Sequence, residues 1–285
     1  MIVGCKGPTS IERWAKAKEE WLRELLRLPH GIPSRDCIRR VLSALKPEAF
    51  QKCFQDWIAA CLLDDANGSH RTIAIDGKTM RRSHDKAAGL GPLHIVSAWA
   101  SEQGIALGQL ATEEKSNELT AIPELIDQID LTDAVVTIDA MGCQKAIAKK
   151  IIDGGGDYVL TVKENQPKLY QAIQTFFDEP TEDDFRHARY RRHETREKGH
   201  GRTDERYDYL AKLPDDFPLK KQWPGIKAIG MVIRMTENSD GTERAEVSYF
   251  IASRYLSGQR FAQSVRRHWG IENSLHWVLD VTFDE

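Results

Sequence analysis

The stretch AVVTIDAMGCQ, residues 134–144, is a short apolar run that ends on an acid, Asp139. An apolar run of this length, bounded by turn residues, predicts a buried strand. A second run of the same kind, RTIAIDGK at residues 71–78, ends on Asp76. An acid at a strand end can cap the next turn, but strand ends in α/β folds are also where ligands bind. The two strands by themselves leave both interpretations open.

The elements around these strands predict the fold class. Three strands in succession are expected at residues 71–78, 93–101 and 104–112, and helices then alternate with further strands up to residue 177. This order favours an α/β fold with a ribonuclease-H-like mixed sheet and flanking helices. A nucleotide-binding Rossmann fold is disfavoured, because no G-x-G-x-x-G follows the first strand and the glycines at 154–156 precede a strand.

Residues 1–66 have a different character, with apolar residues at helical spacing. We expect a helix that carries Trp14 and Trp21, a break at residues 28–34 where Ser34 caps the next helix, and a third helix after Pro47. A scaffold role is favoured over nucleic-acid binding for this all-helical region. A linker at residues 62–71 separates it from the second region, residues 67–285.

The composition is that of a globular protein. The chain has 285 residues, 41% of them hydrophobic, and a formal net charge of −3. Because it has neither an apolar run of about 20 residues nor a secretory signal, we expect a cytoplasmic protein. Its five cysteines show no C-x-x-C spacing, so neither a disulfide framework nor a zinc site is predicted.

One segment is basic, although the chain as a whole has a small net negative charge. Residues 186–206 hold eight Lys or Arg, three His and four acids. They fall in a basic, mostly β insertion at about 180–245, with strands expected at 205–213 and 226–235. The core pattern resumes at 246–253. Taken alone, the basic segment is also consistent with a solvated charged loop.

A third acid lies on the long helix expected at residues 257–279. At about 100° per residue, the large apolar and aromatic side chains of this helix fall within about 60° of Glu272, so Glu272 is predicted at the centre of the buried face. Arg266 and Arg267 fall on the opposite side. A buried carboxylate must be paired, neutralised or bound to metal. Three convergent acids, Asp76, Asp139 and Glu272, therefore suggest a divalent cation.

The expected ligands are all oxygen, which suits Mg²⁺ or Mn²⁺ rather than zinc. Two such ions about 4 Å apart can activate a water or sugar hydroxyl on one side of a phosphodiester and stabilise the leaving oxygen on the other. Nearby cations fit a polyanion backbone along the same edge, although for each one taken alone an ordinary exposed charge is the favoured interpretation. These cations are Lys78, Arg81, Arg82 and Lys163.

At these residues the sequence resembles the DDE transposases of bacterial insertion sequences, most closely the H-repeat-associated, transposase-like branch. The resemblance covers nearly the whole chain and is carried by several ordered segments. They include IAIDGKTMRRS (73–83), HIVSAWASEQGIALGQ (94–109), EKSNELTAIPELI (114–126), VVTIDAMGCQ (135–144), GGGDYVLTVKENQ (154–166), KGHGRTDER (198–206) and RHWGIENSLHWVLDVTF (267–283). The resemblance implies that Asp76, Asp139 and Glu272 are the catalytic and metal-binding triad of a ribonuclease-H-like catalytic domain at 67–285.

The resemblance further implies cleavage and transfer of DNA strands at the ends of the protein's own mobile element. It implies Mg²⁺ as cofactor, with Mn²⁺ as the alternative, and double-stranded DNA as partner. It also implies a homodimer assembled on DNA, and a nucleoid-associated protein in the cytoplasm. Four further residues are expected to contact DNA: His200, Arg202, Arg266 and Arg267.

Two departures from the family pattern bear on activity. Related branches carry Tyr, Arg and Lys around the glutamate where this chain has Val265, His268 and Leu279, so those auxiliary roles do not carry over. Family members also extend beyond both ends of this chain, which is therefore expected to be a truncated member. The alternative function is an inactive transposase remnant that binds DNA only.

Overall fold

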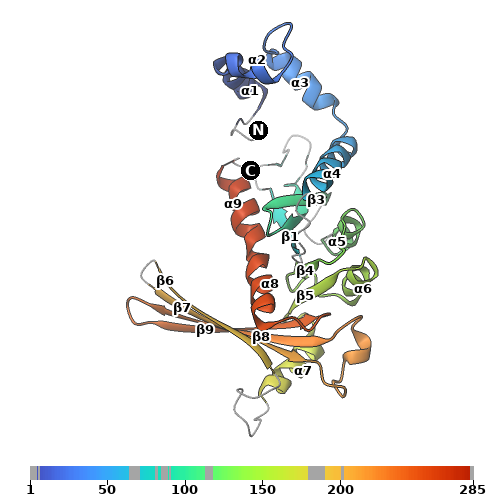
Figure 1. The fold of residues 1–285 in the computed structure, drawn as a ribbon, viewed down its shortest axis with the longest axis vertical. Coiled ribbons are helices and arrows are strands. Elements are labelled where there is room, and N and C mark those ends of the chain that lie inside the picture. Colours follow the sequence, from blue (N-terminus) through green and yellow to red (C-terminus); the bar gives the residue numbers. More distant parts are fainter. Residues whose placement is uncertain are drawn as a thin grey trace. The chain divides into compact units, whose positions relative to one another are not determined.

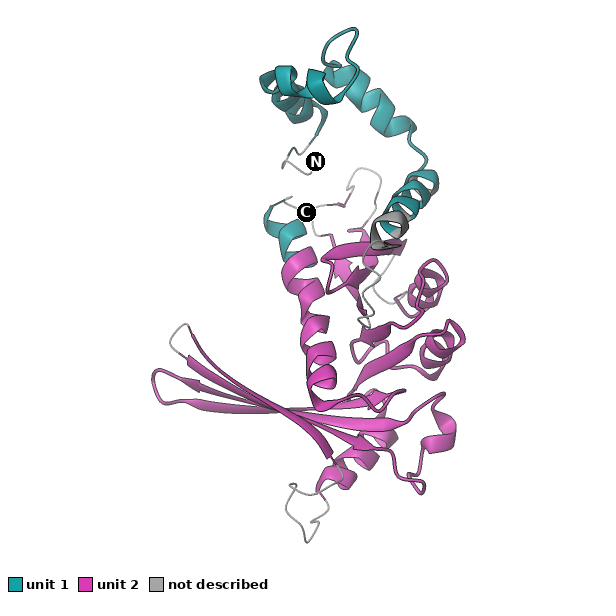
Figure 2. Cartoon of the chain, viewed as in Figure 1, with its two compact units in different colours: residues 1–67, 276–285 teal, residues 68–275 magenta. Residues whose placement is uncertain are grey.

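The computed structural model describes the chain in two compact units, Met1–Asn67 with His276–Glu285, and Gly68–Leu275 (Figures 1 and 2). The described residues are 5, 7–63, 71–80, 83–84, 89, 91–112, 118–178, 190–199 and 202–282.

The first unit is helical, as predicted. Its helices are α1 (Pro8–Ala17), α2 (Glu19–Leu25), α3 (Arg35–Ala44), α4 (Pro47–Leu63) and α9 (Trp277–Val281). The predicted cap is confirmed, since the Ser34 hydroxyl accepts a hydrogen bond of 3.3 Å from the Cys37 amide. The first expected helix is divided in two at Lys18, and Trp14 and Trp21 meet edge to face across the break, with ring centroids 6.3 Å apart.

The core of the second unit is a mixed sheet. Strands β1 (Thr72–Thr79), β4 (Val135–Ile138) and β5 (Asp157–Val162) run parallel, while β2 (His94–Ala100) and β3 (Ile105–Thr112) are antiparallel to their neighbours. The strand order begins β3-β2-β1-β4-β5. This arrangement confirms the predicted ribonuclease-H-like fold class, because an all-parallel doubly wound sheet would contain no antiparallel β2 and β3.

Four more strands extend the same sheet beyond β5, which gives nine strands among the described residues: β6 (Tyr190–Gly199), β7 (Arg202–Lys212), β8 (Ala228–Asn238) and β9 (Glu243–Ala252). β9 pairs with β5, and β8, β7 and β6 follow outward in antiparallel pairs. The interpretation of the basic segment as a solvated loop is wrong for residues 190–199 and 202–206. Backbone pairing makes them strands although most of their side chains are exposed.

Helices cover both faces of the parallel strands. α8 (Gly258–Gly270) runs along one face, and α5 (Glu118–Ile126) and α6 (Lys145–Asp153) lie on the other (Figure 1). α7 (Pro167–Asp178) packs near β9, and a short 3₁₀ turn spans Lys220–Gln222. The Ser257 hydroxyl caps α8 by accepting from the Arg260 amide at 3.2 Å.

The long C-terminal helix is not uniform. After α8 the chain forms a π-helical segment, Ile271–His276, before α9. A π-turn holds an extra residue, so a wheel drawn at the α-helical period loses its phase there.

The second unit has a buried apolar core between the sheet and α8. Val135, Val159, Phe250 and Phe261 pack together where α8 crosses the sheet. Within the described residues, no helix combines the length and the apolar character needed to cross a bilayer.

Candidate active site

The register of the sheet brings Asp76 and Asp139 to the same edge. Ile75 is paired with Ile138 in the parallel β1–β4 ladder, so the two acids are the next residues along adjacent strands. Neighbouring strands lie about 4.8 Å apart. The prediction that these strands are neighbours is therefore confirmed, and the two acids are adjacent in the register. The prediction that the first strand ends at Asp76 is wrong, because β1 stays paired with β2 as far as Thr79.

The carboxylate of Asp139 does cap its turn. Its Oδ1 accepts backbone hydrogen bonds from Met141 at 3.0 Å and from Gly142 at 3.2 Å. The loop is tight, because a Cβ on Gly142 would lie 2.2 Å from Cγ2 of Ile138. The turn-cap interpretation is thus correct, and it leaves the second oxygen of Asp139 as the one that could bind a ligand.

The charge environment of Asp76 is unfavourable to its ionised form. The pKa of the Asp76 carboxyl is raised to about 7, mainly by burial and in addition by the negative charges of Asp139, Glu272 and Glu118, while the Gly77 backbone amide opposes the rise. Like charges that share a site disfavour one another's ionisation. The electrostatics therefore places Asp139 and Glu272 within interaction range of Asp76.

The last turn of α8, and Ile271 directly after it, pack on β1, β2 and β4 beside the two aspartates. Ile271 is fully buried against Ala74 and Trp99, and the His268 ring meets the Thr137 hydroxyl at an Nδ1 to Oγ1 distance of 3.2 Å. Because alternate residues of a strand share a face, Ala74 and Thr137 lie on the same face as Asp76 and Asp139 respectively.

His268 itself lies close to Asp139. Burial lowers the pKa of the His268 imidazole, and the negative charge of Asp139 opposes that shift. The last turns of α8 thus lie over the part of the sheet that carries the two aspartates, Asp76 within β1 and Asp139 directly after β4.

The prediction that Glu272 is centred on the buried face is wrong. Glu272 is exposed, and its neighbour Ile271 is the buried residue. The physical reason is the π-helical segment that begins at Ile271, which changes the rotation per residue at this point. Among the described residues, no three His, Cys, Asp or Glu side chains are gathered closely enough to hold a metal ion.

The expected DNA-binding cations have varied surroundings. Lys163 is exposed directly after β5, and Lys78 is partly buried on β1. Arg202 pairs with Asp204 at 2.8 Å. Three of the expected residues, Arg81, Arg82 and His200, lie outside the described residues.

The two arginines of α8 hold carboxylates of the protein itself. Arg266 makes a two-pronged ion pair with Glu197 of β6, at 2.5 and 2.8 Å. Arg267 pairs with Glu102, which also accepts the Thr72 amide at 2.8 Å. Arg267 therefore contributes to fixing α8 at the start of β1.

A buried pair behind Asp76 was not predicted. His94 Nε2 and Glu118 Oε1 are 2.6 Å apart, and the other ring nitrogen of His94 meets the Thr79 hydroxyl at 3.0 Å. Both side chains pack against Gly77, where a Cβ would lie 2.3 Å from Glu118 Oε1. The one signal in the sequence is the glycine itself, since a glycine inside a strand often marks a close approach.

Two amides on the loop after β5 were also missed as candidate residues. Asn165 Nδ2 donates to the Ala140 carbonyl at 2.5 Å, and Gln166 Nε2 donates to the Cys143 carbonyl at 2.9 Å. Both acceptors belong to the loop that carries Asp139. Neutral polar residues after a strand give no sequence signal that separates this role from an ordinary turn.

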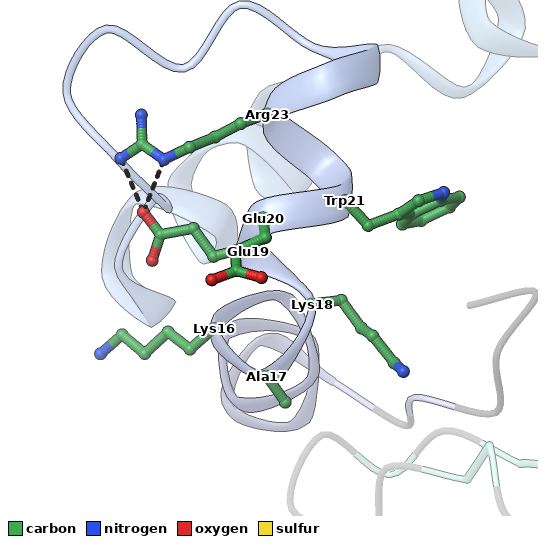
Figure 3. A pocket seen from close by; sticks show the side chains of 7 residues that line it. All are labelled: Lys16, Ala17, Lys18, Glu19, Glu20, Trp21 and Arg23. Atoms are coloured by element: carbon green, nitrogen blue, oxygen red, sulfur yellow. Dashed lines mark hydrogen bonds and ion pairs between the residues drawn. The ribbon is translucent and has the colours of Figure 1, made fainter.

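A surface hollow in the first unit carries no comparable chemistry. It is lined by α1 and α2, where Glu19 and Arg23 form an ion pair of 2.6 Å (Figure 3). The lining residues are Lys16, Ala17, Lys18, Glu19, Glu20, Trp21 and Arg23. Mixed exposed charges of this kind are typical of a solvated surface.

Comparison with known proteins decides the family. Residues 67–285 match the family model described as a transposase DDE domain, and residues 1–58 match the one described as DDE_Tnp_1-associated. This chain belongs to the DDE transposase family. The two acids on β1 and β4 and the acid after α8 all fall within the matched transposase domain.

Relatives of this DDE transposase come from enterobacteria among other sources. The chain is 39% identical to the "Putative transposase YncI" of Escherichia coli O157:H7, over 100% of this chain and 72% of that protein. It is 37% identical to the "H repeat-associated putative transposase YhhI" of Escherichia coli strain K12, over 100% of this chain and 75% of that protein. These relatives confirm the predicted H-repeat-associated branch.

Among solved structures, the transposase resembles a piggyBac transposase synaptic complex with hairpin DNA. The TM-score is 0.42 at 10% sequence identity, covering 91% of this chain and 53% of that chain.

Proposed function

We propose that this transposase cleaves and transfers DNA strands at the ends of its own mobile element, with Asp76, Asp139 and Glu272 as its catalytic carboxylates. The observation that carries the proposal is the β1–β4 register, which sets Asp76 beside Asp139. Burial, together with the negative charges of Asp139 and Glu272, raises the pKa of Asp76 to about 7. Carboxylates gathered against their mutual repulsion are characteristic of functional sites.

The donor set suits a hard divalent cation. Carboxylate oxygens are the ligands that Mg²⁺ and Mn²⁺ prefer. Asp76 and Asp139 would hold the cation, and Glu272 would complete the ligand set. When bound, a pair of such ions supplies activation of a water or hydroxyl and stabilisation of the leaving oxygen.

Contacts within the protein hold the aspartates and helix α8 in position. The β1–β4 register sets the two aspartates at one edge, and the backbone amides of Met141 and Gly142 fix one oxygen of Asp139. The His268–Thr137 contact keeps the last turn of α8 over β4. DNA would lie along this edge, with Lys78 and Lys163 as phosphate contacts.

A second candidate is a remnant that binds DNA without cleaving it. The exposure of Glu272, and the absence of a gathered three-residue metal cluster among the described residues, favour this alternative. The remnant would retain salt-sensitive DNA binding, because phosphate contacts do not require the acids.

A cleavage assay separates the two candidates. The substrate is DNA carrying the short inverted repeats that flank the coding region, incubated with Mg²⁺ or Mn²⁺. Under the proposal, Asp139→Ala and Glu272→Ala each lose strand cleavage by a factor of at least ~10³, while binding to the same DNA is retained. The matched control is Glu124→Ala, which removes an exposed acid of α5 and should cleave normally.

Normal cleavage by both acid variants would show that the triad assignment is wrong. Binding without cleavage by the parent chain would favour the remnant.

A further inference from the structure

The loop at residues 139–144, here called the Asp139 loop, is held at both of its ends by one neighbouring segment. Asn165 donates to the carbonyl of Ala140, directly after the acid, at 2.5 Å. Gln166 donates to the carbonyl of Cys143, near the end of the loop, at 2.9 Å, and also reaches Gln144 Oε1 at 3.3 Å. Consecutive side chains thus bracket the loop.

The bracketed loop is one whose shape determines where the acid points. Asp139 Oδ1 is tied to the amides of Met141 and Gly142, so any displacement of those amides displaces the carboxylate. Gly142 packs closely against Ile138, since an added Cβ would lie 2.2 Å from Ile138 Cγ2. Asn165 and Gln166 bind two carbonyls of the same loop.

The segment that supplies the two amides is itself held by backbone hydrogen bonds. The Gln166 backbone amide donates to the Lys163 carbonyl at 3.0 Å, which closes a turn after β5. The Gln166 carbonyl then accepts the amide of Tyr170 at 2.9 Å in the first turn of α7. Groups mounted on a strand-to-helix junction hold their partners more accurately than groups on a free loop.

The two side chains that donate to the loop, Asn165 and Gln166, are uncharged amides. Carboxamides satisfy two loop carbonyls without adding charge, whereas a lysine or arginine in their place would compete with a cation for the acids. The neighbouring cation on this segment, Lys163, is exposed. The loop is therefore held by neutral groups beside a site where charge matters.

We propose that Asn165 and Gln166 are positioning residues, which hold the Asp139 loop so that the carboxylate of Asp139 stays aligned with that of Asp76. The proposal rests on the proposed function for the role of Asp139, but the loop restraint can be measured separately. Outer residues that orient metal-binding side chains typically contribute 10- to 100-fold to metal affinity or activity.

The test compares four variants with the parent chain. Asn165→Ala/Gln166→Ala removes both donors, and Gln166→Glu keeps the shape of one side chain but cannot donate when ionised. Glu164→Ala is the matched control, because it removes an exposed side chain from the same turn. Asp139→Ala tests the acid itself.

The first readout is amide hydrogen exchange, which needs neither metal nor DNA. In the double variant the amides of residues 140–144 should exchange at least ~10-fold faster, while those of β4 remain protected and show that the fold is intact. Gln166→Glu should show the same change more weakly, and Glu164→Ala should show none. Unchanged exchange in both donor variants would overturn the proposal. If the double variant fails to fold, Gln166→Glu alone decides.

The second readout is function. Mn²⁺ affinity, measured by electron paramagnetic resonance, should fall ~10-fold in the double variant, and kcat for strand cleavage should fall 10- to 100-fold with KM for DNA unchanged. If Asp139→Ala is inactive but the double variant has the parent's kcat and Mn²⁺ affinity, the positioning role alone is wrong. If Asp139→Ala cleaves normally, the proposed function fails instead.

Discussion

Replacing Asp76 with asparagine should stabilise the folded protein at pH 8 while it abolishes strand cleavage. The folded state holds this carboxyl where burial and three neighbouring acids raise its pKa to about 7, from 3.8 for a free aspartic acid. At pH 8 the group is ionised in both the folded and the unfolded chain, so the folded state carries the whole penalty. Asparagine has nearly the same shape and no charge, and it removes that penalty.

The pKa shift sets the size of the effect. A rise from 3.8 to about 7 corresponds to an upper limit of roughly 4 kcal/mol, at about 1.36 kcal/mol per pK unit. Asp76 retains some exposure, and the site can relax around the charge. We therefore expect the free energy of unfolding at pH 8 to rise by about 1–2 kcal/mol, or roughly 2–8 °C in Tm for a domain of this size.

The stability gained by Asp76→Asn should depend on pH. Because the folded pKa is raised, the penalty is absent below about pH 4, grows as the pH rises toward 7, and is constant above that. The stability difference between Asp76→Asn and the parent chain should follow this course. Mg²⁺ should stabilise the parent chain at pH 8 but not Asp76→Asn, because a bound cation relieves the same repulsion.

Urea unfolding at pH 5, 6, 7 and 8, followed by circular dichroism, provides the measurement. Asp216→Asn is the matched control, since it removes an exposed aspartate from a turn and should give no pH-dependent difference. The reasoning would be refuted if Asp76→Asn were no more stable than the parent chain at pH 8, or if its advantage did not change with pH.

Two further substitutions test other parts of the site. Gly77→Ala should lower the free energy of unfolding by about 1–3 kcal/mol, because its Cβ would lie 2.3 Å from Glu118 Oε1. Gly91→Ala, with nothing within 4 Å of the new atom, is its control in the same urea titration, and equal midpoints would contradict the close packing. Glu197→Gln releases Arg266 from its ion pair and should tighten DNA binding, with the slope of log affinity against log salt steeper by about one charge. Fluorescence anisotropy over a salt series measures this slope, and an unchanged slope would mean that Arg266 does not contact phosphate.

The sheet could be predicted because its strands carry their own signals. Apolar runs at 72–75 and 135–138 are fully buried, and acids end both of them, so the neighbouring positions of Asp76 and Asp139 followed from strand order. β6 could not be predicted in this way. Most of its residues are exposed, and it is a strand because its backbone pairs with β7 from Tyr190 to Gly199. Backbone pairing of a charged edge strand leaves no pattern in hydrophobicity.

The position of Glu272 was beyond sequence reasoning for a different reason. A helical wheel assumes one period along the whole helix, and the period changes at Ile271. The change coincides with the burial of Ile271 against Ala74 and Trp99, which are contacts between residues far apart in the chain. Only the packed structure reveals such contacts.

The chain holds its three acids in different ways, and this difference explains why two are adjacent before any ligand binds. Backbone pairing between β1 and β4 fixes Asp76 and Asp139, and amide hydrogen bonds fix one oxygen of Asp139 again. Glu272 depends on side-chain contacts of a helix, through His268 and Ile271, and the π-helical segment then leaves it exposed. Its charge acts on Asp76 less strongly than that of Asp139 does. Under the proposed function, the sheet supplies two of the three ligands and the helix supplies the third, so the contacts of His268 and Ile271 also determine where Glu272 lies.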